Sequence, residues 1–256
     1  MRTKRIAFLF FFAALALAKT SHAVGPAVRG SCVYSADVSQ GTVYPDEKAN
    51  MLKPVEFLTS MAIDLDGAPN AYGPPGWPAL DKESSAHHVG KISGPIVGYL
   101  TESDGRTPKV QGKHDLCPGY YISTTGFYNH DKTISDDNPR KYLDATKVNY
   151  VVRGRFASAH NANLGDLIAV YSKKTRKSVF GIIGDSGNPC DCEGSLALLR
   201  ALGYPVKNIQ EDGVDEKEFL IRYYPHSNLH KHFFRNQKQI DNQANALGLS
   251  KEFAAH

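Results

Sequence analysis

VFGIIGDSGNPCDCEGSLALLRALG, residues 179–203, is the stretch that decides how the fold of this chain is interpreted. Its first residues, 179–183, form an apolar run with the length and β-rich composition of a buried strand. A glycine-bearing turn at 184–187 ends that strand. Good helix formers then occupy 195–202, and Gly203 stops the helix. The stretch therefore predicts a strand, a loop and a short helix in succession.

Two carboxyl groups flank the predicted loop. Asp185 comes at the end of the strand, and Glu193 comes at the start of the helix. A pair of carboxyls facing each other across a groove is what cleavage of a glycosidic bond requires, because one donates a proton and the other acts as base or nucleophile. Structural roles are the alternative. An Asp after a strand commonly caps a turn, and a Glu in the first helical turn interacts favourably with the helix dipole.

A second pair of acids lies upstream. Apolar residues at 61, 63 and 65 alternate with polar or small ones, which predicts a half-buried strand that carries Asp64 and Asp66 on one face. Gly67 ends it. Such a pair could be a solvated strand edge. The Asp-x-Asp-Gly order is also found in calcium loops, but no Glu follows at the spacing that an EF-hand requires.

The rest of the chain is rich in short β-type segments. Strand composition is found at 119–125, 147–153 and 166–171. Short strands at close spacing, with a single helix after Asp185, predict a mainly β (α+β) fold, a single β-barrel domain with a few peripheral helices. The final segment, 227–256, is basic and has helical composition, and we separate it as a C-terminal tail from the domain at 24–226.

The N-terminus has the pattern of a signal peptide at 1–23. Basic residues precede an apolar run at 6–18, and a small-x-small site ends at Ala23. The signal holds four of the 30 basic residues and no acid, so the formal charge of +4 becomes 26 basic against 26 acidic residues after cleavage. We therefore expect a secreted or periplasmic protein that binds no nucleic acid. No later segment is apolar enough to predict a membrane span.

The number and positions of the cysteines are consistent with export of the protein. Cys32, Cys117, Cys190 and Cys192 all follow the predicted cleavage site, and disulfides are the default in an oxidising compartment. Because Cys190 and Cys192 are one residue apart, we expect each of them to pair with Cys32 or Cys117 instead of with the other. A four-cysteine zinc site is the competing interpretation, which the Cys-x-Cys spacing does not favour.

Several strings of this sequence resemble the fungal-type chitosanases, family 75 of the glycoside hydrolases. The segment GDSGNPCDCEGSLALLRALG is similar to the active-site signature of that family, and IDLDGAPNAY is similar to its second signature. The strings GYYISTT, KYLDA, VNYVV and GDLIAVY also resemble family motifs, in the order of the family. The resemblance covers residues 61–224, and the insert 188–192 departs from it by replacing a charged loop.

The resemblance implies a function and a set of residues. It implies endo-cleavage of chitosan with inversion and without a cofactor or metal, and we expect Asp185 to be the acid and Glu193 the base. The candidate substrate-binding residues are Asp64, Asp66, Tyr121, Ser123, Asp144 and Trp77. Trp77 is the only tryptophan, and on a loop it could stack on a sugar ring or cover the core.

The strand, the Gly-Asp-x-Gly turn and the helix also resemble double-psi barrels, so we expect a double-psi-like topology. Two other functions stay open. A muramidase would act on de-N-acetylated peptidoglycan, which shares the β-1,4 amino-sugar backbone. A non-catalytic module would bind cell-wall polysaccharide, but it would have no need of a matched Asp–Glu pair.

Overall fold

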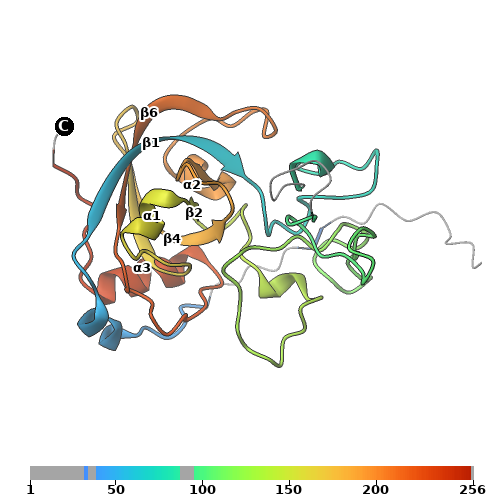
Figure 1. Cartoon of the computed structure of the whole chain (residues 1–256), viewed down its shortest axis with the longest axis horizontal. Helices are drawn as coiled ribbons and strands as arrows, with labels where there is room; N and C mark the ends of the chain where they lie inside the picture. Colours follow the sequence, from blue (N-terminus) through green and yellow to red (C-terminus); the bar gives the residue numbers. More distant parts are fainter. Residues whose placement is uncertain (1–31, 34–38, 87–94, 255–256) are drawn as a thin grey trace, which may run out of the picture.

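The computed structural model describes residues 32–33, 39–86 and 95–254. The predicted signal peptide and its cleavage site near Ala23 lie outside the described residues. Six strands form a closed barrel in the order β1-β5-β2-β4-β3-β6 (Figure 1). The strands are β1 (Val55–Asp64), β2 (Tyr150–Arg153), β3 (Leu167–Ser172), β4 (Ser178–Ser186), β5 (Glu193–Ser195) and β6 (Val214–Tyr223). The predicted β-barrel with peripheral helices is therefore confirmed, and the double-psi-like topology stays a prediction.

Short helices surround the barrel. The α-helices are α1 (Arg155–Ala159), α2 (Leu196–Ala201) and α3 (Gln237–Ala246), and the 3₁₀ helices are η1 (Pro45–Asn50), η2 (Glu83–Ala86) and η3 (Pro139–Lys141). The predicted helix after Asp185 is α2, whose first turn is capped by Ser195: the hydroxyl oxygen accepts a bond from the Leu198 N–H at 3.1 Å. In the part of the chain that is described, no helix has the length and apolar character needed to cross a membrane.

The central strands are buried on both faces. In β3, Leu167 and Ala169 belong to one apolar cluster, whereas Ile168 and Val170 belong to another. Because successive side chains of a strand point in opposite directions, both faces of β3 are covered. This explains why 166–171 and 179–183 appear in the sequence as continuous apolar runs, and β3 and β4 confirm both predicted strands.

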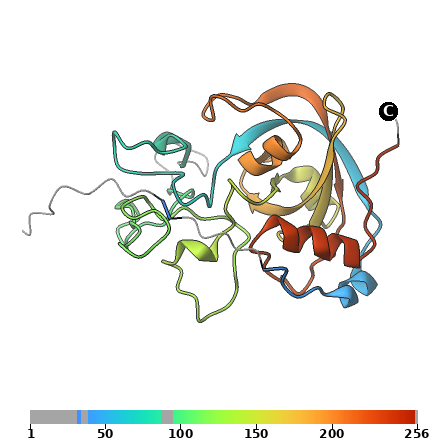
Figure 2. The ribbon, with the colours of Figure 1, turned by 180° about the vertical axis from the view of Figure 1, so that it is seen from behind.

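The C-terminal segment is part of the packed structure. The helix expected from its composition is α3, which lies against the barrel (Figure 2). Ile240 and Ala244 are fully buried in the apolar cluster that also contains Phe180 of β4. Segment 227–253 therefore covers one side of the barrel.

A loop-rich layer lies beside the barrel, formed by the chain between β1 and β2 (Figures 1 and 2). The strand predicted at 119–125 lies here, but it makes only isolated bridges, Tyr121 with Val110 and Ser123 with Tyr99. Its backbone hydrogen bonds are shared among three separate segments, around residues 72, 98–100 and 109–111, so no continuous ladder forms. The prediction of a strand was wrong for this reason.

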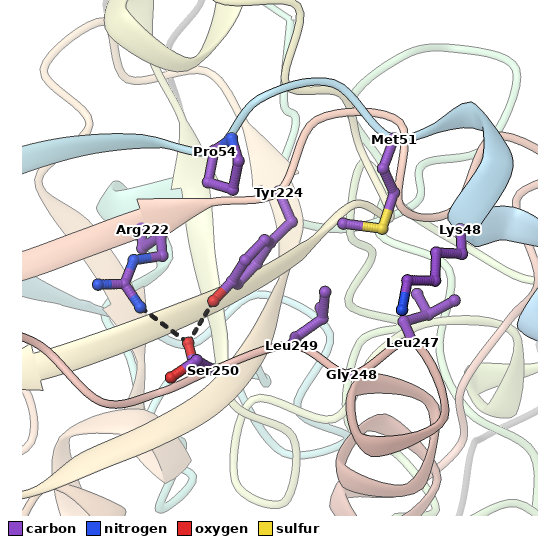
Figure 3. A pocket seen from close by; sticks show the side chains of 9 residues that line it. All are labelled: Lys48, Met51, Pro54, Arg222, Tyr224, Leu247, Gly248, Leu249 and Ser250. Carbon is purple, nitrogen blue, oxygen red and sulfur yellow. Dashed lines mark hydrogen bonds between the residues drawn. The ribbon is translucent and has the colours of Figure 1, made fainter.

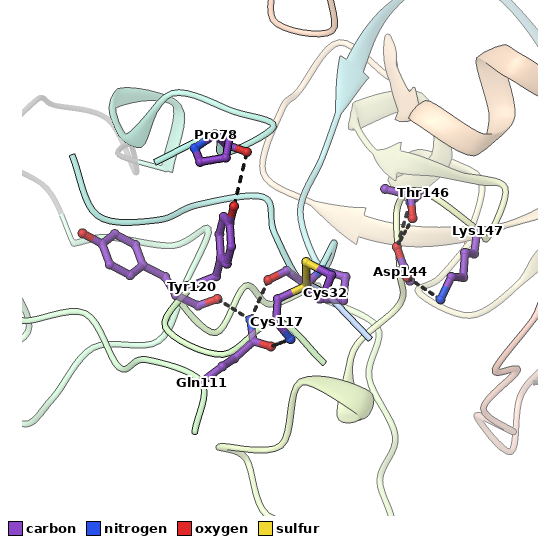
Figure 4. Close-up of a disulfide and its surroundings, with 10 residues drawn as sticks. Cys32, Pro78, Gln111, Cys117, Tyr120, Asp144, Thr146 and Lys147 are labelled. Atoms are coloured by element: carbon purple, nitrogen blue, oxygen red, sulfur yellow. Dashed lines mark hydrogen bonds and ion pairs between the residues drawn. A yellow bond between two sulfur atoms is a disulfide. The ribbon is translucent and has the colours of Figure 1, made fainter. Parts of the chain in front are cut away.

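The disulfide prediction was also wrong. One bond joins Cys32 to Cys117 (Figure 4), and the other joins Cys190 to Cys192. Asp191 adopts a left-handed backbone conformation with φ 53°, which folds the chain back between its two neighbours. The Cα atoms of Cys190 and Cys192 are then 5.1 Å apart, within the range that disulfides span.

Asp191 also holds this tight loop against the rest of the protein. Its buried carboxylate accepts hydrogen bonds from the backbone N–H groups of Gly154, Phe156 and Ala157, at 2.9, 2.7 and 3.1 Å. These groups lie at the start of α1, where helical N–H groups have no partner within the helix. The Cys190–Cys192 loop therefore anchors the chain between β4 and β5 to the neighbouring α1.

Candidate functional site

A cleft of about 490 Å³ opens between one end of the barrel and the loop-rich layer. Five acidic side chains line it, and none of the described residues that line it is Lys, Arg or His. The lining residues come from the end of β1, the loop-rich layer, β2, the β4–β5 loop and the segment before β6: Ile63, Asp64, Leu65, Asp66, Tyr72, Asp81, Ser85, Val97, Val152, Asp185, Ser186, Gly187, Asn188, Pro189, Glu193, Ile209 and Gln210.

Strand pairing brings the acids together. β1 runs parallel to β5, with Ala62 opposite Glu193 and Asp64 opposite Ser195. β2 runs parallel to β4, with Val152 opposite Asp185. β5 also bonds antiparallel to β2, and carboxylate oxygens of Asp64, at the end of β1, and Asp185, near the end of β4, lie within 4.8 Å of each other. The sequence-predicted pair Asp185 and Glu193 therefore lines one cleft, together with Asp64 and Asp66.

Asp185 is held rigidly at the base of the cleft. Its side chain is only 7% exposed, and its Oδ1 atom accepts bonds from the N–H groups of Ser186 at 2.6 Å and Gly126 at 2.9 Å. Burial raises the pKa of Asp185 to about 7, the two backbone hydrogen bonds oppose that rise, and the charge of Glu193 adds to it. A carboxyl with this pKa retains its proton well above the ordinary range of Asp.

Glu193 lies in β5 and not, as the sequence suggested, at the start of the helix. Ser195 is the N-cap of α2, so Glu193 is displaced from the helical N–H groups that would favour its charged form. Burial instead raises the pKa of Glu193, and a hydrogen bond of 2.6 Å from the Asn188 side-chain amide partly offsets this. The charge-stabilising donor is therefore Asn188, which belongs to the 188–192 insert.

Asp64 and Asp66 form the other wall of the cleft. β1 ends at Asp64, so Asp66 lies in the following turn and its N–H donates to Asp64 Oδ1 at 2.9 Å. Gly67 has φ 79°, and a Cβ atom there would lie 1.9 Å from the carbonyl oxygen of Leu143, so the turn requires glycine. The prediction of one strand carrying both acids was wrong in this detail. Both carboxyls still line the cleft.

Burial is also the main cause of the high pKa values of these two acids. It raises the pKa of Asp64 well above the ordinary value, and the charge of Asp185 raises it further. The pKa of Asp66 is raised in the same way by burial and by the charge of Asp64. The carboxyls of the cleft therefore tend to stay protonated, and each one that ionises makes ionisation of the next less favourable.

Two further residues of the site, Tyr72 and Asp81, were not predicted from the sequence. The Tyr72 hydroxyl donates to Asp66 Oδ1 at 2.6 Å and lies 3.3 Å from Asp81 Oδ2. Tyr72 is the last residue of the string IDLDGAPNAY, so its position in that motif was the available signal. Asp81 has no comparable motif, and only the folding of the loop-rich layer brings it to the cleft.

Two predicted substrate-binding residues, Tyr121 and Ser123, pack within the loop-rich layer. Ser123 is buried, and its hydroxyl accepts from the Gly67 N–H at 2.9 Å and donates to the Gly98 carbonyl at 2.8 Å. The ring of Tyr121 is 5.0 Å from that of Tyr99. Neither residue is among those that line the cleft, and Ser123 supports the turn that carries Asp66.

Trp77 and Asp144 likewise lie outside the cleft lining. The Trp77 ring meets Tyr120 edge-on at 5.0 Å and lies against Gly119, so it packs within the loop-rich layer. Asp144 Oδ1 accepts bonds from the N–H and hydroxyl groups of Thr146, and Oδ2 is 3.3 Å from Lys147 Nζ (Figure 4). Asp144 therefore stabilises its own turn.

The acids at the cleft also have the geometry of possible metal ligands. Carboxylate oxygens of Asp64, Asp66 and Asp185 all lie within 4.8 Å of one another, and oxygen ligands suit hard cations. The charges of neighbouring acids contribute to their raised pKa values, and a bound cation would lower those values. We assign no metal to it.

A second hollow, of about 430 Å³, is mainly apolar and lies beside the C-terminal segment (Figure 3). Arg222 and Tyr224 at its edge both donate to the carbonyl oxygen of Ser250. Its lining has no acid–base pair, because its other residues are Lys48, Met51, Pro54, Leu247, Gly248 and Leu249. The acidic cleft is therefore the better candidate for chemistry.

Comparison with known proteins adds no assignment. No protein-family model matches this chain, and a search of curated proteins finds no match. The chemistry of the cleft is therefore the basis for inferring the function of this protein.

Asp185→Asn should stabilise the protein at alkaline pH. A carboxyl whose folded-state pKa is raised loses stability as the pH rises from its ordinary pKa, near 4, to its folded value of about 7. The Asn side chain keeps the oxygen that accepts from Gly126 and Ser186 but cannot ionise. We expect its free energy of unfolding at pH 8 to exceed that of the wild type by about 1–4 kcal/mol, with little difference at pH 4.

Urea unfolding at the two pH values, with disulfides intact, measures this difference. Asp144→Asn is the matched control, because it removes a carboxylate that is paired with Lys147 and should not stabilise at pH 8. If Asp185→Asn is instead less stable than the wild type at pH 8, the charged form of Asp185 stabilises the fold and its ionisation is not unfavourable.

Proposed function

We propose that this chain is an exported glycoside hydrolase that cleaves β-1,4 bonds in a glucosamine-containing polymer, with chitosan as its substrate. The observation that carries the proposal is one acidic cleft that contains the buried carboxyl of Asp185 and the half-buried carboxyl of Glu193. The resemblance to the family 75 chitosanases suggested the same two residues from sequence. Cleavage within the chain, with inversion, is what that resemblance implies.

The surroundings of the two carboxyls support different roles. Asp185 is the general acid, because its pKa of about 7 keeps a proton available for the leaving oxygen. Glu193 is the general base that activates water. Its hydrogen bond from Asn188 favours the charged form, which a base needs before it can accept a proton.

The charge of the cleft supports an amino-sugar substrate. Its lining holds five acids and no basic residue among those described, which suits a polymer that carries ammonium groups. A carboxylate makes a charge-assisted hydrogen bond to an ammonium group, and an uncharged acetamide lacks that partner. A bound ammonium would also lower the raised pKa values of Asp64 and Asp66, so substrate binding and loss of their protons are coupled.

The disulfide bonds support export of the protein from the cytoplasm. The Cys32–Cys117 disulfide is of the kind that persists in oxidising compartments, and the sequence of residues 1–23 has the pattern of a signal peptide. A protein exported in this way would meet polysaccharide outside the cytoplasm.

The first test compares substrates and variants. Mature protein should shorten chitosan to oligomers, and Asp185→Asn and Glu193→Gln should each lower kcat by at least about 10²–10⁴-fold, because each loses a proton-transfer group. The products are sized by mass spectrometry. Glu56→Gln is the control, since Glu56 lies at the other end of β1 in an ion pair with Arg222.

The same assay separates the other functions. Cleavage of deacetylated peptidoglycan with chitosan left intact would make the protein a muramidase. Binding of either polymer without cleavage, unchanged in the two cleft variants, would make it a non-catalytic binding protein and would overturn the proposal.

The second test is the pH dependence of kcat/KM on a soluble glucosamine oligomer. Activity should fall as the pH rises through about 7, because Asp185 then loses the proton that it must donate. It should also fall at acidic pH, as Glu193 takes up a proton, with a midpoint above the ordinary Glu value because burial raises its pKa. If the alkaline limb is retained in Asp185→Asn with measurable residual activity, another group is the acid.

The third test concerns substrate charge. Asp66→Asn keeps an oxygen for the Tyr72 hydroxyl but loses the negative charge. For fully deacetylated oligomers, KM should rise by roughly 5–150-fold, equivalent to about 1–3 kcal/mol for a charge-assisted bond, while kcat changes less. Partly acetylated oligomers are the control, since fewer ammonium groups should give a smaller effect. An equal change for both substrates would contradict the role of Asp66.

A further inference from the structure

A separate group of metal-ligating side chains lies near the start of β1, away from the rim that bears the cleft. Glu47 belongs to η1, and His230 and His232 belong to the segment that follows β6. One ligand atom from each residue lies within 4.8 Å of the others. His230 Nδ1 is 2.9 Å from Glu47 Oε1, and His232 Nε2 is 3.6 Å from the same oxygen.

Glu47 is buried without a permanent positive partner. Its side chain is fully buried, and within the described part of the chain its ion pairs involve only the two imidazoles. The carboxylate accepts hydrogen bonds from the Leu229 and His230 N–H groups, so its negative charge is stabilised in the fold. An imidazole is charged only when protonated, so a bound cation would supply the full positive charge that the two histidines lack.

The backbone holds the Glu47 carboxylate in place. Glu47 Oε2 accepts from the Leu229 N–H at 3.1 Å, and Oε1 accepts from the His230 N–H at 3.0 Å. Hydrogen bonds of this kind orient carboxylate ligands in metal sites and do not prevent the same oxygen from binding a metal. Oε1 is therefore fixed beside both imidazoles.

The two histidines are also held toward Glu47. The ring of His232 stacks on Tyr44 with a centroid distance of 3.4 Å and an interplanar angle of 1°. Lys231, between the histidines, has a left-handed backbone with φ 55°. Non-glycine residues seldom adopt this conformation, and here it accompanies the turn of both imidazoles toward one carboxylate oxygen.

We propose that Glu47, His230 and His232 bind a zinc-type divalent transition-metal ion. Imidazole nitrogen and carboxylate oxygen are ordinary zinc ligands, with metal–ligand distances of about 2.0–2.2 Å. Ligand atoms at neighbouring corners of such a tetrahedron are about 3.3–3.5 Å apart. The 3.6 Å separation is close to that value, whereas the 2.9 Å separation is that of a hydrogen bond, whose proton the metal ion would replace. The His230 side chain is 57% exposed, so an ion can reach this ligand from solvent.

The ion would join two distant parts of the chain. Glu47 and His230 are 183 residues apart, and the segment of the histidines leads into α3. Binding would therefore stabilise the attachment of η1 to the C-terminal segment. This inference does not depend on the proposed hydrolase activity, because the site shares no residue with the acidic cleft.

The test uses untagged, chelator-treated full-length mature protein and Zn²⁺ alone as the probe. Competition with a chromophoric chelator should show one Zn²⁺ per chain, and saturating Zn²⁺ should raise Tm by roughly 5–10 °C at 100 times the Kd. His230→Gln and His232→Gln should each weaken binding by at least about 100-fold. His114→Gln, at an exposed histidine of the loop-rich layer, is the matched control and should bind like the wild type.

X-ray absorption at the zinc edge of the wild-type protein gives a readout that does not depend on the folding of the variants. Two imidazole ligands and one carboxylate are expected. Coordination by oxygen alone, a stoichiometry below one, or affinity that survives both His230→Gln and His232→Gln would overturn the proposal and leave Glu47 and His230 as a hydrogen-bonded pair.

Discussion

The three residues of β5 are the constraint on which the barrel depends. Gly194 pairs with Ile63 of β1 on one side and with Val151 of β2 on the other, so β5 closes the sheet. A Cβ atom at Gly194 would lie 2.8 Å from the sulfur of Met61 and 2.9 Å from Leu198, so a larger residue would force these two buried side chains to shift. The residue before it, Glu193, is thereby fixed beside the end of β1. The residue after it caps α2 and, through its hydroxyl, accepts from the Tyr150 N–H.

Closure of the barrel has an electrostatic cost that is concentrated at one rim. Asp185 is buried, Asp64 and Glu193 are half-buried, and the charge of Glu193 opposes the ionisation of both aspartates. Tyr72 and Asn188 offset part of this cost through hydrogen bonds to Asp66 and Glu193. A purely structural site would gain by replacing these acids with neutral residues, whereas a site that must donate a proton near neutral pH needs a carboxyl in such surroundings. The cost is therefore itself an argument for function.

The pattern of apolar residues in the sequence predicted the strands that are buried on both faces. It did not predict strands that are very short or that contain charged residues. β4 and β3 were visible because burial on both faces leaves continuous apolar runs. β6 begins with charged residues at 215–218, and β5 has only three residues, too few for any period. The residues of the candidate site also differ in how well the sequence predicts them. Asp185 and Glu193 were found through a motif. Their hydrogen-bond partners Gly126 and Asn188, which oppose the rise in their pKa values, come from a distant loop and from the 188–192 insert. Pairing of the cysteines depended on the backbone conformation of Asp191, which composition does not reveal.

Glu47 and Asp185 show that burial alone does not determine what an acid can do. Burial tends to raise both pKa values, yet the pKa of Glu47 is lowered because hydrogen bonds from His230 and Leu229 outweigh it. Burial outweighs the two backbone hydrogen bonds that Asp185 accepts, the charge of Glu193 adds to the effect, and the pKa of Asp185 rises to about 7. One acid is therefore held as an anion beside imidazoles, which suits a cation. The other is held as a proton donor beside a second carboxyl, which suits acid catalysis. At the two ends of one barrel, the surroundings of a carboxyl thus determine whether its charged or its protonated form is favoured.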